Sequence, residues 1–102
     1  MLNIMLSCCM GASTSIVAAK MRKEAEKQGK EVNIWAVDTD EIPAEMGKAD
    51  VILLGPQVRH MLKKIEGTVN GAVPVAVISP VDYGRCNAPA ILAMAEKLVE
   101  KK

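Results

Sequence analysis

The sequence has 102 residues, of which half are hydrophobic, and its 13 basic and 12 acidic side chains give a formal net charge of +1. This balance excludes a general electrostatic attraction to nucleic acid, and no apolar stretch approaches the roughly 20 residues that span a bilayer. With one Trp, one Tyr and no Phe, the core must be aliphatic, and the length suits a single domain over residues 1–102.

The first elements alternate between an apolar strand and an amphipathic helix. Residues Leu2–Ser7 predict a strand that is apolar on both faces, as in the middle of a parallel sheet. A helix is predicted over Ser13–Gln28, because apolar residues recur there at every fourth position: Val17, Met21 and Ala25. Gly29 stands where a helix C-cap is expected.

The middle of the chain repeats this alternation. Glu31–Val37 predicts a second strand, and the cluster Asp38-Thr39-Asp40 can cap a short helix that ends near Met46. Asp50–Leu54 predicts a buried third strand, and Gln57–Glu66 predicts a helix.

The last third contains one more strand and one more helix. Asn70-Gly71 is typical of a turn, and Val73–Ile78 predicts a fourth strand, which Pro74 places at a sheet edge. Ser79–Arg85 is expected to be a loop and Asn87–Val99 a helix. Such alternation predicts right-handed βαβ units. We therefore predict an α/β three-layer sandwich, with a four-stranded parallel sheet in the order 2-1-3-4 and helices on both faces.

The stretch after the first strand has the composition of an anion-binding loop. Small and hydroxyl residues there join a strand to the start of a helix: Cys8, Cys9, Met10, Gly11, Ala12, Ser13, Thr14 and Ser15. Converging loop amides and the helix dipole would attract an anion, and a thiol at this position would have a lowered pKa. We predict Cys8 as a phosphate-accepting nucleophile and the residues from Cys9 to Ser15 as its phosphate-binding loop.

Other loop types fit this stretch less well. It lacks the three glycines of a dinucleotide-binding fingerprint and the ending of a Walker loop. It is close to the loop of cysteine phosphatases, but Thr14 occupies the position of their arginine and Ser15 that of their Ser or Thr. Without a guanidinium to stabilise the transition state, the site should hold a phosphoryl group rather than hydrolyse it. A small cysteine phosphatase or arsenate reductase, and a binding or redox module using Cys8 and Cys9, stay open as alternatives.

Ligand chemistry in open α/β sheets gathers where the strands end. Cys8 should therefore face Gln57, Asp82 and Tyr83 across a shallow crevice. The three cysteines and the single histidine have no spacing typical of a metal site. We expect no metal and no cofactor.

The chain resembles the lactose/cellobiose-class enzyme IIB proteins of the bacterial phosphoenolpyruvate-dependent sugar phosphotransferase system. The stretches that carry the resemblance span the chain: Leu6–Ser15, Lys20-Met21-Arg22, Ala49–Gln57, Met61-Leu62 and Tyr83-Gly84. The resemblance implies the fold of the low-molecular-weight cysteine phosphatases. It also implies an enzyme, a protein-phosphohistidine–sugar phosphotransferase, in which Cys8 takes a phosphoryl group from a IIA histidine. The group would then pass to a cellobiose-, chitobiose- or lactose-like disaccharide held by the IIC membrane transporter.

The remaining expectations concern partners and location. IIA and IIC are the expected partners, with no nucleic acid and no direct insertion into the membrane. We expect an isolated monomer in the cytoplasm, transiently at the inner face of the membrane through the transporter. A IIB protein of another sugar class, such as the galactitol or ascorbate type, is the alternative within this system.

Overall fold

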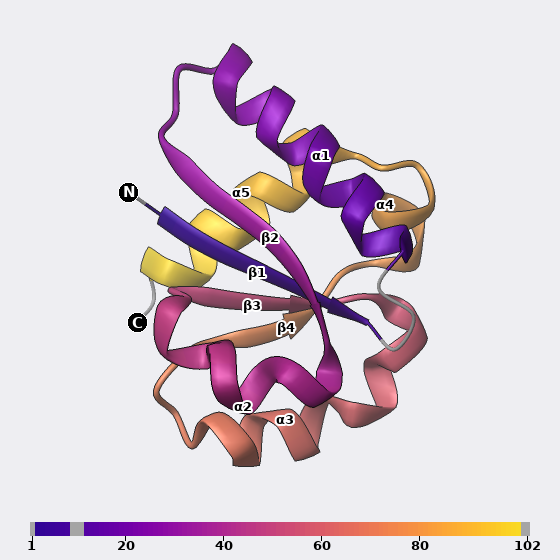
Figure 1. Cartoon of the computed structure of the whole chain (residues 1–102). Helices are drawn as coiled ribbons and strands as arrows, with labels where there is room; N and C mark the ends of the chain where they lie inside the picture. The colour runs from indigo at the N-terminus through magenta and orange to yellow at the C-terminus, as the bar shows by residue number, and fades with distance from the viewer. Residues whose placement is uncertain (1, 9–11, 101–102) are drawn as a thin grey trace.

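The computed structural model describes residues 2–8 and 12–100, with the backbone alone for residues 8 and 12–14. Four parallel strands form one sheet in the order β2-β1-β3-β4 (Figure 1). The strands are β1 (Leu2–Cys8), β2 (Val32–Asp38), β3 (Val51–Leu54) and β4 (Val75–Val77). This order confirms the sequence prediction, and it places β1 and β3 in the centre.

Helices cover both faces of this sheet. The face toward the top of Figure 1 carries α1 (Ala12–Lys27), α4 (Pro80–Gly84) and α5 (Ala88–Glu100). The opposite face carries α2 (Ile42–Glu45) between the short 3₁₀ turns η1 (Thr39–Glu41) and η2 (Met46–Lys48), and α3 (Leu62–Val69) after η3 (Pro56–Met61). The three-layer prediction is therefore confirmed.

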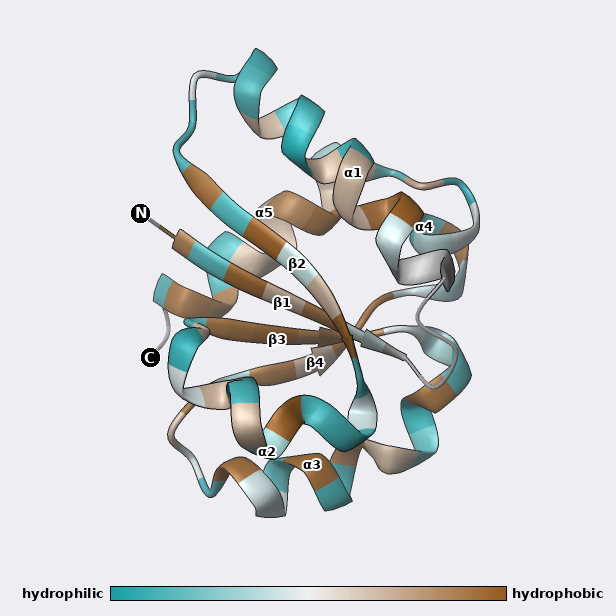
Figure 2. Cartoon of the chain, viewed as in Figure 1, coloured by the Kyte–Doolittle hydropathy of each residue, from teal (hydrophilic) through white to brown (hydrophobic). Residues whose placement is uncertain are grey.

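The hydrophobic core is divided by the sheet, because successive strand residues point to opposite faces. Ile4 and Leu6 of β1 pack with Met21 of α1 and Leu92 of α5. Met5, between them in sequence, packs on the other side with residues of α2, η3 and α3. β3 is fully buried at all four positions, which explains its continuous hydrophobic colour in Figure 2.

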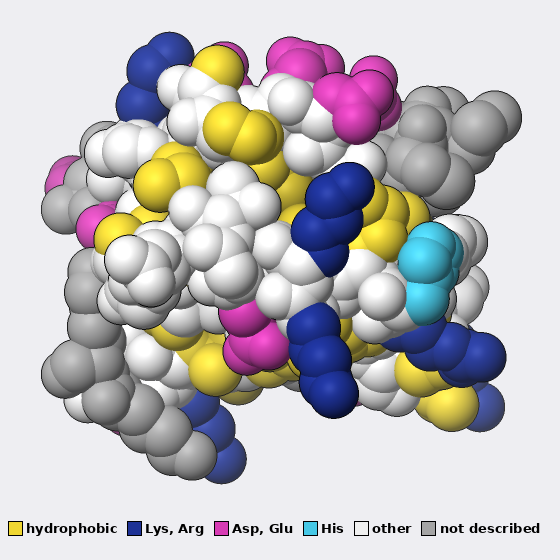
Figure 3. All heavy atoms as spheres, turned by 90° about the horizontal axis from the view of Figure 1, so that it is seen from below, with side chains coloured by type: hydrophobic (Ala, Val, Ile, Leu, Met, Phe, Trp, Pro, Cys, Tyr) yellow, Lys and Arg dark blue, Asp and Glu magenta, His cyan; other side chains and the backbone are white. Residues whose placement is uncertain are grey.

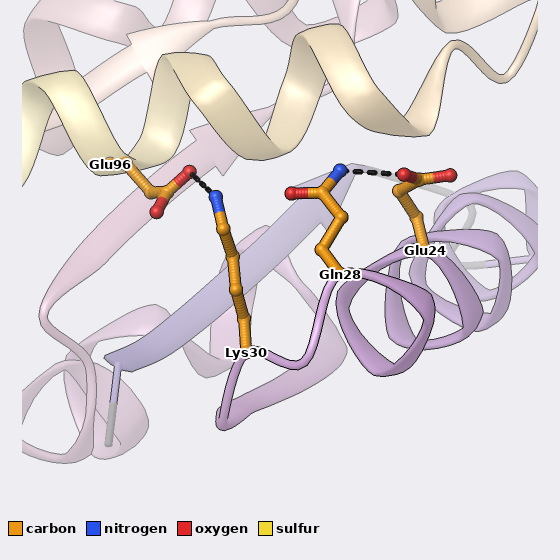
Figure 4. A network of polar contacts seen from close by, with 4 residues as sticks. All are labelled: Glu24, Gln28, Lys30 and Glu96. Atoms are coloured by element: carbon orange, nitrogen blue, oxygen red, sulfur yellow. Dashed lines mark hydrogen bonds and ion pairs between the residues drawn. The ribbon is translucent and has the colours of Figure 1, made fainter.

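The predicted amphipathic helix is present as α1, with the three predicted apolar residues buried at its inner face: Val17, Met21 and Ala25. Gly29 has φ +71°, and Lys30 N donates to Ala25 O at 2.8 Å, which closes the predicted C-terminal cap. At this end Lys30 Nζ lies 2.7 Å from Glu96 Oε1 of α5, and Gln28 donates to Glu24 (Figure 4). The ion pair is exposed, so it contributes little to stability.

Three local predictions were wrong. The helix predicted over Gln57–Glu66 is two elements: η3 ends at Met61 and contains Val58, whose angles are non-helical (φ −116°, ψ 22°), and α3 begins at Leu62 and continues to Val69. The loop predicted over Ser79–Arg85 contains α4, which begins with Pro80 in its first turn. Asp38 precedes η1 but its side chain makes no capping hydrogen bond.

Candidate functional site

The carboxyl ends of all four strands lie at one edge of the sheet, where the predicted site was placed (Figure 1). β1 ends at Cys8, and α1 begins at Ala12, so the predicted strand–loop–helix is present in the backbone. Ser13 and Thr14 belong to the first turn of α1, and Ser15 follows them with an exposed side chain. The predicted roles of Cys9, Met10 and Gly11 fall outside the described residues, and those of the Cys8, Ser13 and Thr14 side chains are equally untested.

Ser7 fixes the backbone from which this loop departs. Its side chain is fully buried, and Ser7 Oγ donates a 2.9 Å hydrogen bond to Val37 O of β2. On the other side, Gly55 N donates to Ser7 O at 2.9 Å. Ser7 is the only buried polar side chain in the described part of the chain. These bonds tie the residue before Cys8 to both neighbouring strands.

The strand register shows what lies beside Cys8. Cys8 pairs with Asp38 at the end of β2, and Ser7 pairs with Leu54 of β3. Because neighbouring strands are about 4.8 Å apart, Asp38 and Gly55 flank Cys8 at the backbone level. The sequence predicts Asp38 only as part of a helix cap; its position directly after an apolar run is the signal that could place it at this edge.

The three other predicted site residues do not share one environment. Gln57 is exposed and lines an open groove with other residues of η3. Asp82 is half-buried and accepts a 3.3 Å hydrogen bond from Asn87 Nδ2. Tyr83 is buried in the core between the sheet, α1 and α5, with 7% of its surface exposed. A contact of any of them with a phosphoryl group on Cys8 stays a prediction.

Charge is distributed unevenly along this edge. The segment after β2 presents exposed carboxylates at Asp38, Asp40 and Glu41, whereas η3 after β3 presents the exposed bases Arg59 and His60. Figure 3 shows the histidine in cyan beside dark blue basic side chains. The sequence of the Cys8 loop itself contains no Lys or Arg. An anion on Cys8 would therefore be neutralised by backbone amides and the dipole of α1, with basic side chains available only from the neighbouring loops.

Two large apolar side chains are exposed in elements that begin at this edge. Ile16 in α1 is 58% exposed, and Val81 in α4 is 60% exposed. Exposed apolar side chains near a reactive group suit contact with another protein. The described residues contain no cluster of three or more His, Cys, Asp or Glu side chains that could hold a metal ion. Among the helices of the described ranges, none has the length and hydropathy of a membrane span.

Comparison with known proteins places this geometry in one family. The family model described as PTS system, Lactose/Cellobiose specific IIB subunit, matches residues 3–94. The chain is 41% identical to the galactose-specific EIIB component of the same system from Lactococcus lactis subsp. cremoris and to the cellobiose-specific EIIB component from Lactococcus lactis subsp. lactis, with 94% of each chain covered. It also resembles the solution structure of the cellobiose-specific IIB component from Borrelia burgdorferi, with a TM-score of 0.83 and 29% identity over 99% of this chain and 94% of that one.

Proposed function

Because the chain belongs to the lactose/cellobiose-specific IIB family of the sugar phosphotransferase system, we propose that Cys8 is the residue that carries its phosphoryl group. The family membership makes the chain a phosphotransferase component of sugar uptake. The observation that supports Cys8 is its position as the last residue of the central strand β1, held at Ser7 by bonds to both neighbouring strands and followed by α1.

The proposed chemistry consists of two in-line displacements at phosphorus. First, the Cys8 thiolate attacks the phosphohistidine of a IIA partner; the S–P bond forms, and the electron pair of the N–P bond returns to the imidazole. Then a sugar hydroxyl attacks; the O–P bond forms, the electron pair of the S–P bond restores the thiolate, and the hydroxyl proton passes to a base on the acceptor side. The protein's contribution is position and electrostatics, from the amides of Cys9–Ser15, the hydroxyls of Ser13 and Ser15, and the α1 dipole.

Two partners must reach Cys8 in succession, namely the IIA phosphocarrier and the IIC transporter with its bound sugar. Ile16 and Val81 support one shared docking surface around the loop, since their exposed apolar surface would be buried by either partner. In this proposal the chain acts in the cytoplasm and meets the membrane only through the transporter. The system supplies the donor as a phosphohistidine, so the transfer requires no metal or organic cofactor.

The sugar belongs to the class of cellobiose-, chitobiose- or lactose-like disaccharides. Two relatives of equal identity are named for galactose and for cellobiose, so similarity of the IIB chain does not select one sugar. This fits a system in which the transporter, rather than this chain, encloses the disaccharide.

Substitution of the adjacent cysteines tests the assignment of Cys8. The wild type, Cys8→Ser and Cys9→Ser are incubated with phosphoenolpyruvate and the upstream phosphocarriers, and intact-protein mass is measured. We expect one added phosphate on the wild type and on Cys9→Ser, and none on Cys8→Ser. A phosphorylated Cys8→Ser protein would refute the assignment.

An aryl phosphate provides the comparison with a phosphatase. The loop has Thr14 where a cysteine phosphatase has its arginine, so a carrier should leave the aryl phosphate intact. Steady turnover of that substrate would favour the phosphatase alternative instead.

A further inference from the structure

An open groove lies beside the Cys8 loop and has no part in the function proposed so far. It has a volume of about 540 Å³ and is lined by residues of η3 and the start of α4: Pro56, Gln57, Arg59, His60 and Pro80. The depression is shallow and open to solvent, so a ligand in it would stay partly exposed. Its two walls come from the loops that follow β3 and β4.

The strand register places this groove next to the proposed phosphocysteine. Ser7 pairs with Leu54, and Gly55 N donates to Ser7 O. Continuing this register by one residue sets Gly55 beside Cys8, about 4.8 Å away at the backbone. The groove begins at the next residue, Pro56. At the level of the backbone, the groove therefore begins one residue beyond the position beside Cys8.

The lining of the groove is rich in unused hydrogen-bond donors. Gln57, Arg59 and His60 are exposed, and none of them forms a hydrogen bond or ion pair with another described residue. The guanidinium offers five N–H donors and the amide two. No acidic residue is among those that line the groove, and the two prolines add apolar surface. This combination suits an oxyanion attached to a polyhydroxylated ring.

We propose that the groove binds the sugar phosphate formed at Cys8, with Arg59 and His60 on the phosphate and Gln57 and the proline rings on the sugar. This inference rests on the proposed function, because it takes the product of the second transfer as its ligand. The Cys8 loop has no Lys or Arg, so the phosphate gains a cationic partner only by moving off the sulfur toward η3. Charge-assisted bonds to a guanidinium favour that displacement. Since the groove is open, its affinity should be low, with a dissociation constant on the order of 1 mM.

An NMR titration of the full, isotopically labelled chain tests this proposal. Glucose 6-phosphate, inorganic phosphate and glucose are added separately. We expect glucose 6-phosphate to shift the amides of Gln57, Arg59 and His60, inorganic phosphate to shift them at higher concentration, and glucose alone to leave them unchanged. Shifts confined to residues 9–15 would locate the anion in the loop and overturn the proposal.

Variants of the two basic groove residues are compared with a control variant outside the groove. Arg59→Gln and His60→Gln should each weaken glucose 6-phosphate binding by about fivefold. Lys63→Gln removes one exposed charge from the neighbouring α3, outside the groove. Its binding of glucose 6-phosphate should change less than twofold, because salt screens the attraction between exposed charges that are not in contact. Equal losses for all three variants would mean general attraction and would overturn the proposal.

The test separates this inference from the proposed function. The Cys8→Ser protein should lose phosphorylation but retain groove binding, because the groove residues are intact. Normal phosphorylation of Cys8 together with no response of η3 to any phosphate would refute the groove alone. If Arg59→Gln slowed phosphorylation by the IIA protein without affecting sugar phosphate binding, η3 would instead be a protein contact and the proposal would be wrong.

Discussion

Replacing Ser7 by alanine should destabilise the fold at the residue that positions Cys8. Ser7 is 0% exposed, and its hydroxyl donates to Val37 O at 2.9 Å. Ser7→Ala removes that bond, which contributes about 0.5–1.5 kcal/mol net. We expect the free energy of unfolding to fall by about 1 kcal/mol, which corresponds to a lower melting temperature by about 4–8 °C for a domain of this size.

Urea denaturation followed by Trp35 fluorescence is a suitable assay, because this single Trp lies half-buried in β2, the strand that accepts the bond. The urea concentration at the midpoint of unfolding should decrease, while the slope of the unfolding free energy against urea concentration stays constant. Ser79→Ala is the matched control, since Ser79 is exposed and makes no side-chain capping bond; it should change stability by less than about 0.5 kcal/mol. If Ser7→Ala were as stable as Ser79→Ala, the buried hydroxyl would not hold β1 to β2 as we argue.

Two further substitutions test the loop and the sheet edge. Thr14→Arg should shorten the lifetime of the phosphorylated protein, because it supplies the guanidinium that a cysteine phosphatase uses. The lifetime is measured from the intact-protein mass over time. An unchanged lifetime in a folded variant would show that Thr14 does not keep the phosphoryl group from water. Arg22 donates from Nε (2.8 Å) and from Nη2 to Ile34 O of the edge strand β2, so Arg22→Met should lower the urea midpoint by an amount equivalent to about 1 kcal/mol. Lys23→Met, at an exposed position without a partner in the described chain, should have little effect, and equal losses in both variants would contradict the role of Arg22.

The main helices and strands were predictable because their apolar patterns extend over many residues or are uninterrupted. α1 has sixteen residues, which is long enough for the apolar residues at every fourth position to identify its buried face. β3 is an uninterrupted apolar run, as a central parallel strand requires. The sheet order followed from the usual handedness of βαβ units together with Pro74, which favours a sheet edge for the strand that begins beside it.

Short elements were not predictable in this way. α4 has five residues, too few for a periodic pattern, and its one buried side chain is Tyr83, which packs in the core. The break at Val58 likewise depends on tertiary packing, since the side chain is 1% exposed while its angles leave the helical region. The apolar pattern alone predicts one continuous helix across such a break, because the segments on both sides of it bury apolar residues.

The candidate site shows the same division between local and long-range information. Cys8 could be placed from the order strand, small-residue loop, helix, which is local. Asp38 and Gly55 could be placed beside it only through the pairing of β1 with β2 and β3. Arg59 and His60 are exposed polar side chains on a short helical turn, and nothing in a single sequence distinguishes such residues from an ordinary solvated surface.

The placement of charge around Cys8 favours a carrier over a hydrolase. A phosphatase concentrates positive charge within its loop, where it stabilises attack by water on the phosphocysteine. Here the loop has none, a carboxylate stands at Asp38 on one side, and the bases stand at Arg59 and His60 on the other. In the proposed function, a phosphoryl group on Cys8 would thus be held without a cationic side chain in its own loop, repelled from the β2 side and attracted toward η3. Such a group should leave most readily when an acceptor approaches from the η3 side.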